Sequence, residues 1–572
     1  MAKTKILTPV LLFILSLTLL SLHSFGQTIM TSAPRLLTDP FLQLPTETSV
    51  RVVWFTEFLG NQHIVTYGEN LDQTIRANTT KLSRTREDQR SQIANPPQQP
   101  VNRDIWRHEA EVTGLTACVR IPYRVTSIRE DGENISSDVF TLAPTPKPGT
   151  PLKILLTSDH QLKPMTAANL QKVVETVGRV DAVWFAGDLI NVSDRASEWF
   201  DDQRGGAFFP ALQGRANYEM EHNGVKTTYT GGEIIQHAPM FTAIGNHEVM
   251  GRLGRKGSLN DEFNDAIPRP VAQKLYSGKS LINNSYNTNT YEEIFTLPQS
   301  KTGGKRYYAV SFGDVRLVVL YVTNMWRTPK LDEKSRGRYR EATPDLNNPE
   351  NWGYGQLIFE PIAQGTQQYN WLTAELNSPE FKQAKYKVVM FHHPPHTLGD
   401  NIVPAYTNPV QIIDRDRNSQ VKAVRYEYPK KADYIIRDVV PLLEAAGVQL
   451  VFYGHSHLWN RFVSPSGIHF LETSNVGNSY GAAWGEKKRE IPNGYQEEYV
   501  ALGDPNNLQP VVPTIDPLLD KDGQPMPYIA SNEITVFSIF DTSTNTISGY
   551  RFDTRAAESE IVKFDEFKLD KI

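Results

Sequence analysis

The stretch that decides the fold is residues 448–461, VQLVFYGHSHLWNR. Its first six residues form a short apolar run typical of a buried strand, and a turn with two histidines follows at once. Four other apolar runs end in the same way, on turns that carry metal-ligand side chains. These turns are Ser158-Asp159-His160-Gln161, Gly187-Asp188-Leu189-Ile190-Asn191, Gly245-Asn246-His247-Glu248 and Phe391-His392-His393-Pro394. Each short turn is a weak indication by itself, but five in succession predict one shared site.

The segments around these turns predict an α/β fold. Strands are expected at residues 153–157, 181–186, 240–244, 386–391 and 448–453. Segments of helical period lie between several of them, at residues 167–180, 367–376 and 434–446. Such alternation predicts a largely parallel sheet covered by helices, and ligands bind these sheets beyond the carboxyl ends of the strands. We therefore expect the five turns to meet in space.

The side chains on the turns suit transition-metal ions. Carboxylates, an asparagine amide and imidazoles together favour Zn, Mn or Fe(II), whereas an all-oxygen set would favour Ca or Mg. There are too many ligands for one tetrahedral ion, so we expect two ions roughly 3.5 to 4 Å apart that share a carboxylate. Asp188 is the expected bridge. Such a pair would clamp a phosphoryl group and generate a bridging hydroxide.

The set of turns resembles the calcineurin-like metallophosphoesterase superfamily, and within it the purple acid phosphatase-like branch. Residues 454–461 are similar to the branch's Gly-His-x-His-x-Tyr-x-Arg ending, and residues 307–313 are similar to its segment before a central strand. Leu42-Gln43-Leu44, followed by residues 50–54, resembles the opening of its fibronectin-III-like domain. The resemblance covers most of the chain after residue 26, and it implies a metal-dependent phosphoric ester hydrolase.

The resemblance also implies a role for each residue. It assigns three ligands to one ion, Asp159, Asp188 and His457, and four to the other, Asp188, Asn246, His392 and His455. His247 matches the position that assists the leaving oxygen. The alternative role is a hydrogen bond to the ligands and no part in the chemistry. An imidazole suits the first role because it can donate a proton near neutral pH. His393 and His396 are candidates for contact with an incoming phosphate.

Two positions depart from the family pattern. Purple enzymes carry Tyr three residues after the bridging Asp, where this chain has Asn191, and many other members carry His two residues after the first Asp, where it has Gln161. Either amide oxygen, or water, could complete that half of the site. Without a phenolate we expect a divalent pair and no purple Fe(III) centre. His160 is expected to point to the opposite face from Asp159 and is left out of the ligand set.

Residues 1–26 have the layout of a secretory signal peptide. Lys3 and Lys5 precede an apolar stretch at residues 6–22, and Ser24-Phe25-Gly26 offers a cleavage site. The stretch is interrupted by polar residues and falls below the roughly 20 apolar residues of a membrane span, so no stable span is expected after cleavage. Cys118 is the single cysteine, which fits a periplasmic or extracellular protein of a bacterial envelope. We expect Cys118 to be a buried residue of a strand.

The chain divides into an N-terminal β-sandwich, fibronectin-III-like, and an α/β metallophosphoesterase domain with central mixed sheets flanked by helices. The sandwich is expected at residues 34–143, from short alternating strands at 50–54, 63–67, 108–112, 121–125 and 139–142. Within it, the polar, Gln-rich residues 78–103 are expected to protrude or to be partly disordered. The proline-rich residues 144–151 predict a linker. The catalytic domain is expected at residues 152–572, with insertions near 199–236, 251–298 and 481–527 and a closing hairpin at 533–540 and 546–552.

Charge and motifs together narrow the function. A net charge of −5 and a pI near 6.3 give no support to nucleic acid as a partner. The leading hypothesis is an exported phosphomonoesterase, acid phosphatase-like, in which hydroxide attacks small phosphate esters in line. The same metal core would suit a phosphodiesterase acting on nucleotides or lipid head groups. A third hypothesis is a catalytically weak cell-surface binding protein, because Gln161 and Asn191 depart from the family pattern.

Overall fold

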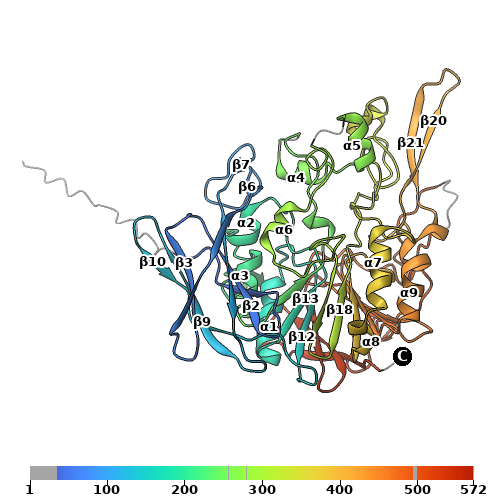
Figure 1. Cartoon of the computed structure of the whole chain (residues 1–572). Helices are drawn as coiled ribbons and strands as arrows, with labels where there is room; N and C mark the ends of the chain where they lie inside the picture. The colour runs from blue at the N-terminus through green and yellow to red at the C-terminus, as the bar shows by residue number, and fades with distance from the viewer. Residues whose placement is uncertain (1–34, 256, 278–279, 494–498, 571–572) are drawn as a thin grey trace, which may run out of the picture. The chain divides into compact units, whose positions relative to one another are not determined.

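The computed structural model describes residues 35–255, 257–277, 280–493 and 499–570 (Figure 1). One compact unit comprises Leu36–Ile572. The expected signal peptide, residues 1–26, lies outside the described residues. In the ranges that the structure describes, no helix has both the length and the apolar character needed to cross a membrane.

Two antiparallel sheets form the core of the N-terminal region, which confirms this part of the predicted fold class. The first has the order β1 (Phe41–Gln43), β2 (Ser49–Thr56), β8 (Trp106–Thr113) and β5 (Asn78–Lys81). The second has the order β10 (Asn134–Ser136), β9 (Ile121–Ile128), β3 (Gln62–Tyr67) and β4 (Gln73–Arg76), with β11 (Phe140–Leu142) also paired to β9. The fibronectin-III likeness and the boundaries 34–143 and 144–151 stay predictions.

Strand β2 is buried on both faces. Because successive side chains of a strand point to opposite sides, Val52 and Trp54 join the core between the two N-terminal sheets. Val53 and Phe55 join the large core that includes the central sheets. The Phe55 ring lies 5.5 Å from that of Phe209 between centroids. Apolar packing therefore joins the N-terminal sheets to the rest of the compact unit.

Two expectations for the N-terminal region were wrong. Residues 78–103 do not simply protrude, since they contain β5, β6 (Arg86–Glu87) and β7 (Val101–Asn102). Arg86, Glu87 and Asp88 are only 7, 4 and 0% exposed. Each pairs with an opposite charge, Arg86 with Glu262, Glu87 with Arg103 and Asp88 with Arg195. Cys118 is exposed and sits in a turn with a φ of 64°, not in a buried strand.

Two mixed sheets form the centre of the remaining chain, as the predicted fold class requires. The six-stranded sheet has the order β16 (Met240–Thr242), β13 (Ala182–Phe185), β12 (Lys153–Thr157), β26 (Ile534–Asp541), β27 (Thr546–Asp553) and β28 (Val562–Lys568). The seven-stranded sheet has the order β17 (Tyr308–Phe312), β18 (Val315–Val319), β19 (Tyr386–Met390), β22 (Leu450–Tyr453), β24 (His469–Thr473), β23 (Trp459–Val463) and β25 (Tyr528–Ile529). The five motif-bearing strands are thus split between two sheets, and parallel pairs occur in both.

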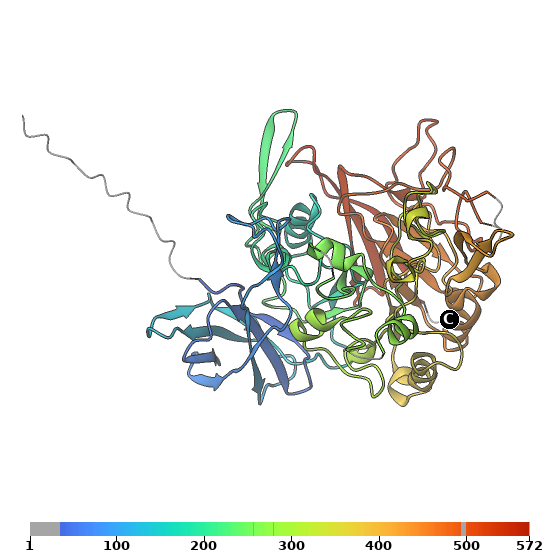
Figure 2. The ribbon, with the colours of Figure 1, turned by 90° about the horizontal axis from the view of Figure 1, so that it is seen from above.

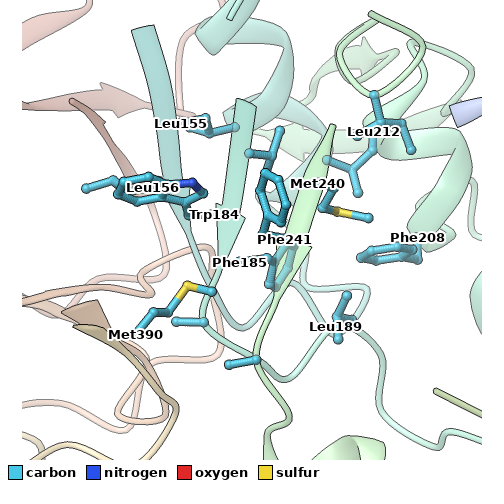
Figure 3. Close-up of a cluster of buried hydrophobic side chains, with 14 of the residues drawn as sticks. Leu155, Leu156, Trp184, Phe185, Leu189, Phe208, Leu212, Met240, Phe241 and Met390 are labelled. Carbon is cyan, nitrogen blue, oxygen red and sulfur yellow. The ribbon is translucent and has the colours of Figure 1, made fainter. Parts of the chain in front are cut away.

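The central strands are mostly apolar because both of their faces are covered. On β19, Val388 and Met390 belong to the core that both sheets share, while Val389 belongs to a second core. Figure 3 shows part of the shared core, which includes Trp184 and Phe241 of the six-stranded sheet and Met390 of the seven-stranded sheet. The second core packs the outer face of the seven-stranded sheet against two helices, α7 (Gln367–Leu376) and α9 (Val440–Ala445).

Helices and hairpins occupy the segments between the central strands. The remaining α-helices are α1 (Thr166–Val177), α2 (Ala196–Phe200), α3 (Phe208–Leu212), α4 (Leu259–Phe263), α5 (Arg269–Leu275), α6 (Asn289–Ile294) and α8 (Pro379–Gln383). Two hairpins stand out in Figures 1 and 2, β20 (Val410–Arg415) with β21 (Val421–Glu427), and β14 (Tyr218–His222) with β15 (Val225–Tyr229). The described part of residues 481–527 contains turns and isolated bridges.

The helix expected at residues 434–446 begins with a π-helical turn, Ile435–Val439, before α9. Pro441 explains the interruption, because proline has no N–H to donate and its ring crowds the carbonyl four residues earlier. Short 3-10 turns complete the regular structure at Asn246–Glu248, Thr343–Asp345, Pro349–Asn351 and Lys430–Ala432.

We expect Phe241→Ala to lower the free energy of unfolding by about 3–5 kcal/mol, because Phe241 is fully buried and its truncation leaves a cavity between the sheets. Its ring also loses an edge contact with Phe312 at 5.9 Å. Urea denaturation followed by circular dichroism measures the change. Val225→Ala, at a site 66% exposed, is the matched control. An equal effect of both substitutions would contradict this packing.

Candidate metal centre

The turns after the five motif-bearing strands meet at one place. Two clusters of ligand atoms lie there, one of Asp188, His392 and His455 and the other of Asp159, Asp188 and His457. Within each cluster all ligand atoms are within 4.8 Å of one another. Because β12, β13 and β16 run parallel, as do β19 and β22, their carboxyl ends present these turns together. Asp188 belongs to both clusters.

The first cluster is organised around Nε2 of His392. This atom lies 3.2 Å from Oδ2 of Asp188, 3.1 Å from Nδ1 of His455 and 3.3 Å from Oδ1 of Asn246. The opposite ring nitrogen, Nδ1, is 2.9 Å from the carbonyl oxygen of Ala186, which can only accept a hydrogen bond, so Nδ1 is the donor. That contact fixes the tautomer and leaves Nε2 available to an ion, as in many metal sites.

The second cluster has the same construction. Nε2 of His457 lies 3.4 Å from Oδ1 of Asp159, and its Nδ1 donates to the carbonyl of Asn478 at 2.9 Å. Oδ1 of Asp159 is buried and has no hydrogen-bond partner. Since an unpaired buried carboxylate oxygen is costly, this atom indicates a place where a cation fits. The mixture of carboxylate, amide and imidazole donors fits a transition-metal pair.

The two variant amides lie in different positions. The Gln161 amide donates to Oδ2 of Asp188 at 2.7 Å, and its buried Oε1 has no partner. The Asn191 amide instead donates to the main-chain carbonyl of Gln161 at 2.8 Å. A half-turn of the Gln161 amide would exchange its oxygen and nitrogen, so Gln161 is better placed than Asn191 to offer an oxygen to an ion.

Proton binding and cation binding compete at this centre. Burial lowers the pKa of His392, but the Asp188 carboxylate outweighs burial and raises that pKa to about 10. Burial would raise the pKa of Asp188, but His392 and His247 hold it well below its usual range. An ion that binds Nε2 of His392 must therefore displace a proton, and metal binding releases it.

Strained turns bring the ligands into position. Asp159, Asp188, His455 and His457 all have left-handed backbone conformations, with φ of 57°, 57°, 83° and 55°. Such conformations cost free energy for residues with a side chain, and they persist where surrounding contacts hold them. Gly454 removes a further obstacle, since a Cβ there would collide with the side chains of Ser158 and Asp159.

Two buried glutamates hold these turns, and sequence reasoning gave neither a role. Glu248 accepts hydrogen bonds from the main-chain N–H groups of Gly245, Asp188 and Leu189 at 2.7, 2.9 and 2.8 Å. Glu472 accepts one from Ser456 at 2.7 Å, between the two histidines of the last turn. Burial raises the pKa of each carboxyl to about 8. A charged residue inside the apolar strand β24 was the available indication for Glu472.

His247 lies beside the clusters and is more accessible than the ligands. Its side chain is 23% exposed, and its Nε2 lies 4.0 Å from Oδ2 of Asp188. Its Nδ1 is 2.7 Å from the carbonyl oxygen of Asn191, so Nδ1 carries a proton and Nε2 faces the centre. Its ring stacks on Phe263 at 4.9 Å. Burial lowers the pKa of His247, and the charge of Asp188 opposes that shift.

The remaining histidines are placed differently from one another. His160 bonds Thr157 at 2.9 Å and packs on Phe185. His393 lies against the centre, with its ring 5.3 Å from that of His455, and it is only 3% exposed. His396 is paired with Asp504 at 2.7 Å and packs on Phe470. Because Nδ1 of His396 is bonded to Asp504, we do not propose the expected contact of His396 with an incoming phosphate.

Comparison with known proteins identifies the family. The sequence profile of the calcineurin-like phosphoesterases matches residues 152–458, more than half of the 572 residues. The chain belongs to the calcineurin-like phosphoesterase family. It is therefore a metal-dependent phosphoester hydrolase, and the family implies a dinuclear site of divalent ions. The two clusters that share Asp188 are the candidate ligands for such a site.

Solved structures show a related fold. Purple acid phosphatase PPD1 from yellow lupin (Lupinus luteus) seeds matches with a TM-score of 0.52 at 13% identity, over 92% of this chain and 74% of that chain. PhoD matches with a TM-score of 0.47 at 12% identity, over 94% of this chain and 91% of that one. No curated protein matches the chain. The family match confirms the predicted superfamily, and the lupin structure shows that a purple acid phosphatase has a related fold.

We expect Gly454→Ala to weaken metal binding about 10–100-fold, because the new methyl group must displace Asp159 from the centre. Metal titration of the apoprotein by calorimetry measures this directly. Gly257→Ala is the control, since a Cβ there meets one side-chain atom at 3.9 Å and the backbone is not left-handed. Unchanged affinity in Gly454→Ala would contradict the close approach of the two turns.

Proposed function

We propose that the protein is an exported phosphomonoesterase acting on small-molecule phosphate esters. The observation that carries this proposal is the pair of ligand clusters joined by Asp188, with the accessible His247 beside them. The family supports phosphoester hydrolysis, and the printed name of the lupin relative supports phosphatase action in this fold. Phosphodiesterase action on nucleotides or lipid head groups is the alternative.

The proposed ligands follow the two clusters. One ion would be held by Asp159, Asp188 and His457, with the Gln161 amide oxygen as a further donor, and the other by Asp188, Asn246, His392 and His455. Bound divalent ions would supply Lewis-acid chemistry, which polarises a phosphoryl group and acidifies water. Asn191 is hydrogen-bonded elsewhere and no tyrosine stands at that position, so we propose a divalent pair of Zn, Mn or Fe.

The chain's own residues would orient the substrate and assist its leaving group. The Asn191 carbonyl accepts the hydrogen bond of Nδ1, so Nε2 of His247 is directed at the centre. In the imidazolium form, which the charge of Asp188 favours, Nε2 also carries a proton and can donate it to the departing oxygen. Tyr480 stacks on His457 at 5.2 Å and is 42% exposed, which makes it a candidate contact for the organic part of an ester. We propose that water attacks phosphorus directly and that no residue becomes phosphorylated.

We expect Asp188→Ala to reduce hydrolysis more than about 100-fold, because both clusters lose their shared ligand. In the unaltered protein we expect a phosphate monoester to be hydrolysed at least about 10-fold faster than the diester with the same leaving group. Steady-state kinetics on the matched pair, with metal analysis of each protein, tests both statements. Glu221→Ala on the exposed β14–β15 hairpin is the control.

The outcomes separate the alternatives. A faster diester would favour the phosphodiesterase. Stoichiometric metal without hydrolysis of either ester would favour the third hypothesis, a catalytically weak cell-surface binding protein. Trapping of a phosphorylated side chain would reject direct attack.

We further propose export with removal of residues 1–26, from the charge and cleavage pattern of that segment. Expression of the full chain in a bacterium should give a mature protein that begins at Gln27 in the periplasm or medium. Fractionation followed by mass spectrometry of the N-terminal peptide tests this. Replacement of Leu11 and Leu12 by Arg should abolish cleavage, and an intact Met1 in the exported protein would contradict the proposal.

A further inference from the structure

A chain of buried contacts connects residues 86–88 of the N-terminal region to His247. Asp88 is fully buried and uses both carboxylate oxygens. Oδ1 accepts a hydrogen bond from Arg195 at 3.0 Å, and Oδ2 accepts one from the main-chain N–H of Leu259 at 2.7 Å. These two contacts begin two separate routes to the same imidazole.

The first route runs through Arg195 and Glu198. The Arg195 guanidinium bonds Asp88 with one nitrogen and Glu198 with the other, the latter at 2.7 Å. Glu198 in turn accepts hydrogen bonds from the main-chain N–H groups of Asn191 and Val192 at 2.7 and 2.9 Å. These bonds fix the Asn191 peptide, whose carbonyl oxygen lies 2.7 Å from Nδ1 of His247.

The second route runs through α4. Asp88 binds the first residue of this helix, Leu259, and the last residue, Phe263, stacks on the His247 ring at 4.9 Å and 26°. Arg86 adds a second hold on the same helix, through Glu262 at 2.7 Å. The segment 86–88 therefore controls both the edge of the imidazole, by way of Asn191, and its face, by way of Phe263.

The segment itself is firmly attached. The main-chain N–H of Arg86 donates to the Asp194 carbonyl at 2.8 Å, and its guanidinium pairs with the Asp194 carboxylate at 2.8 Å. Glu87 accepts from the N–H of Ser197 in α2 at 2.8 Å. Buried ion pairs of this kind add little stability over an apolar core, but removal of one partner leaves an uncompensated buried charge. They are suited to fixing a geometry.

We propose that Asp88 is a positioning residue for His247, so that the N-terminal region completes the catalytic centre. This inference rests on the proposed role of His247 in assisting the leaving oxygen. Such assistance matters most for a poor leaving group such as a simple alcohol, and least for a nitrophenol, which departs without a proton. Loss of positioning should show the same dependence, whereas general destabilisation should not.

The test compares turnover of an alkyl and a nitrophenyl phosphate monoester by metal-loaded protein. Asp88→Asn keeps an oxygen for Leu259 but loses the charge that holds Arg195. We expect kcat for the alkyl ester to fall about 10-fold and kcat for the nitrophenyl ester to fall less than about 2-fold, with KM and metal content unchanged. Arg195→Lys keeps the charge but cannot bridge two carboxylates, so we expect it to lower the two kcat values as Asp88→Asn does.

Two further proteins make the result decisive. In a His247→Ala background, Asp88→Asn should cause no additional loss, because residues that act through one another are not additive. Glu375→Gln breaks a largely buried pair with Arg316 (2.7 Å) between α7 and β18 and should show no leaving-group dependence.

Each outcome has one meaning. Equal losses on both esters, or a further loss in the His247→Ala background, would overturn the positioning role of Asp88. A His247→Ala protein that loses no more activity on the alkyl than on the nitrophenyl ester would overturn the proposed function of His247 itself.

Discussion

The Asp188 carboxylate, shared by two ligand clusters, is the constraint on which the rest of the structure depends. A carboxylate is small, so the five turns must converge on a single side chain. Ligand atoms of Asp159, His392, His455 and His457 lie within 4.8 Å of it, and the main-chain N–H of His247 donates to it at 2.9 Å. Two separate sheets have to end at the same place for this to happen. The shared apolar core does that work, because Trp184 and Met390 come from different sheets and pack in one cluster. The close approach also excludes side chains at Gly245 and Gly454, where a Cβ would strike Asp188 and Asp159 respectively.

Burying so many polar groups together requires partners for each of them. Glu248 and Glu472 supply much of this by accepting main-chain N–H groups of the turns. The left-handed conformations of the ligand residues are tolerated for the same reason, since the turns are held from both sides. The ligands themselves stay incompletely satisfied, as the unpaired oxygen of Asp159 shows. A bound cation would supply the partner that this buried carboxylate oxygen lacks.

Sequence reasoning succeeded where local chemistry decides the structure. The expected strand at residues 153–157 and helix at 367–376 have the observed bounds, because an apolar run and a Thr366 cap define them locally. The division of strands between two sheets was not predictable in this way, since it depends on pairings distant in sequence. The gathering of Asp159, Asp188 and His457 followed from strand-end logic, but the roles of Glu472 and Asp88 did not. Both are charged residues that composition alone assigns to solvent, and only tertiary contacts show them buried.

The proposed metal ligands and His247 are held in place by different parts of the chain. The ligands are held by the turns themselves and by glutamates of the same catalytic strands and turns, so their geometry is set within the central sheets. His247 is held by a peptide and a helix whose ionic contacts lead to residues 86–88. Cation binding and leaving-group assistance are therefore separable in physical terms, because a change in one support need not disturb the other. The apolar contact of Phe55 in β2 with Phe209 in α3 packs the N-terminal sheets against the rest of the compact unit. A β-sheet region without proposed catalytic side chains of its own can in this way set the geometry of a histidine in the proposed centre.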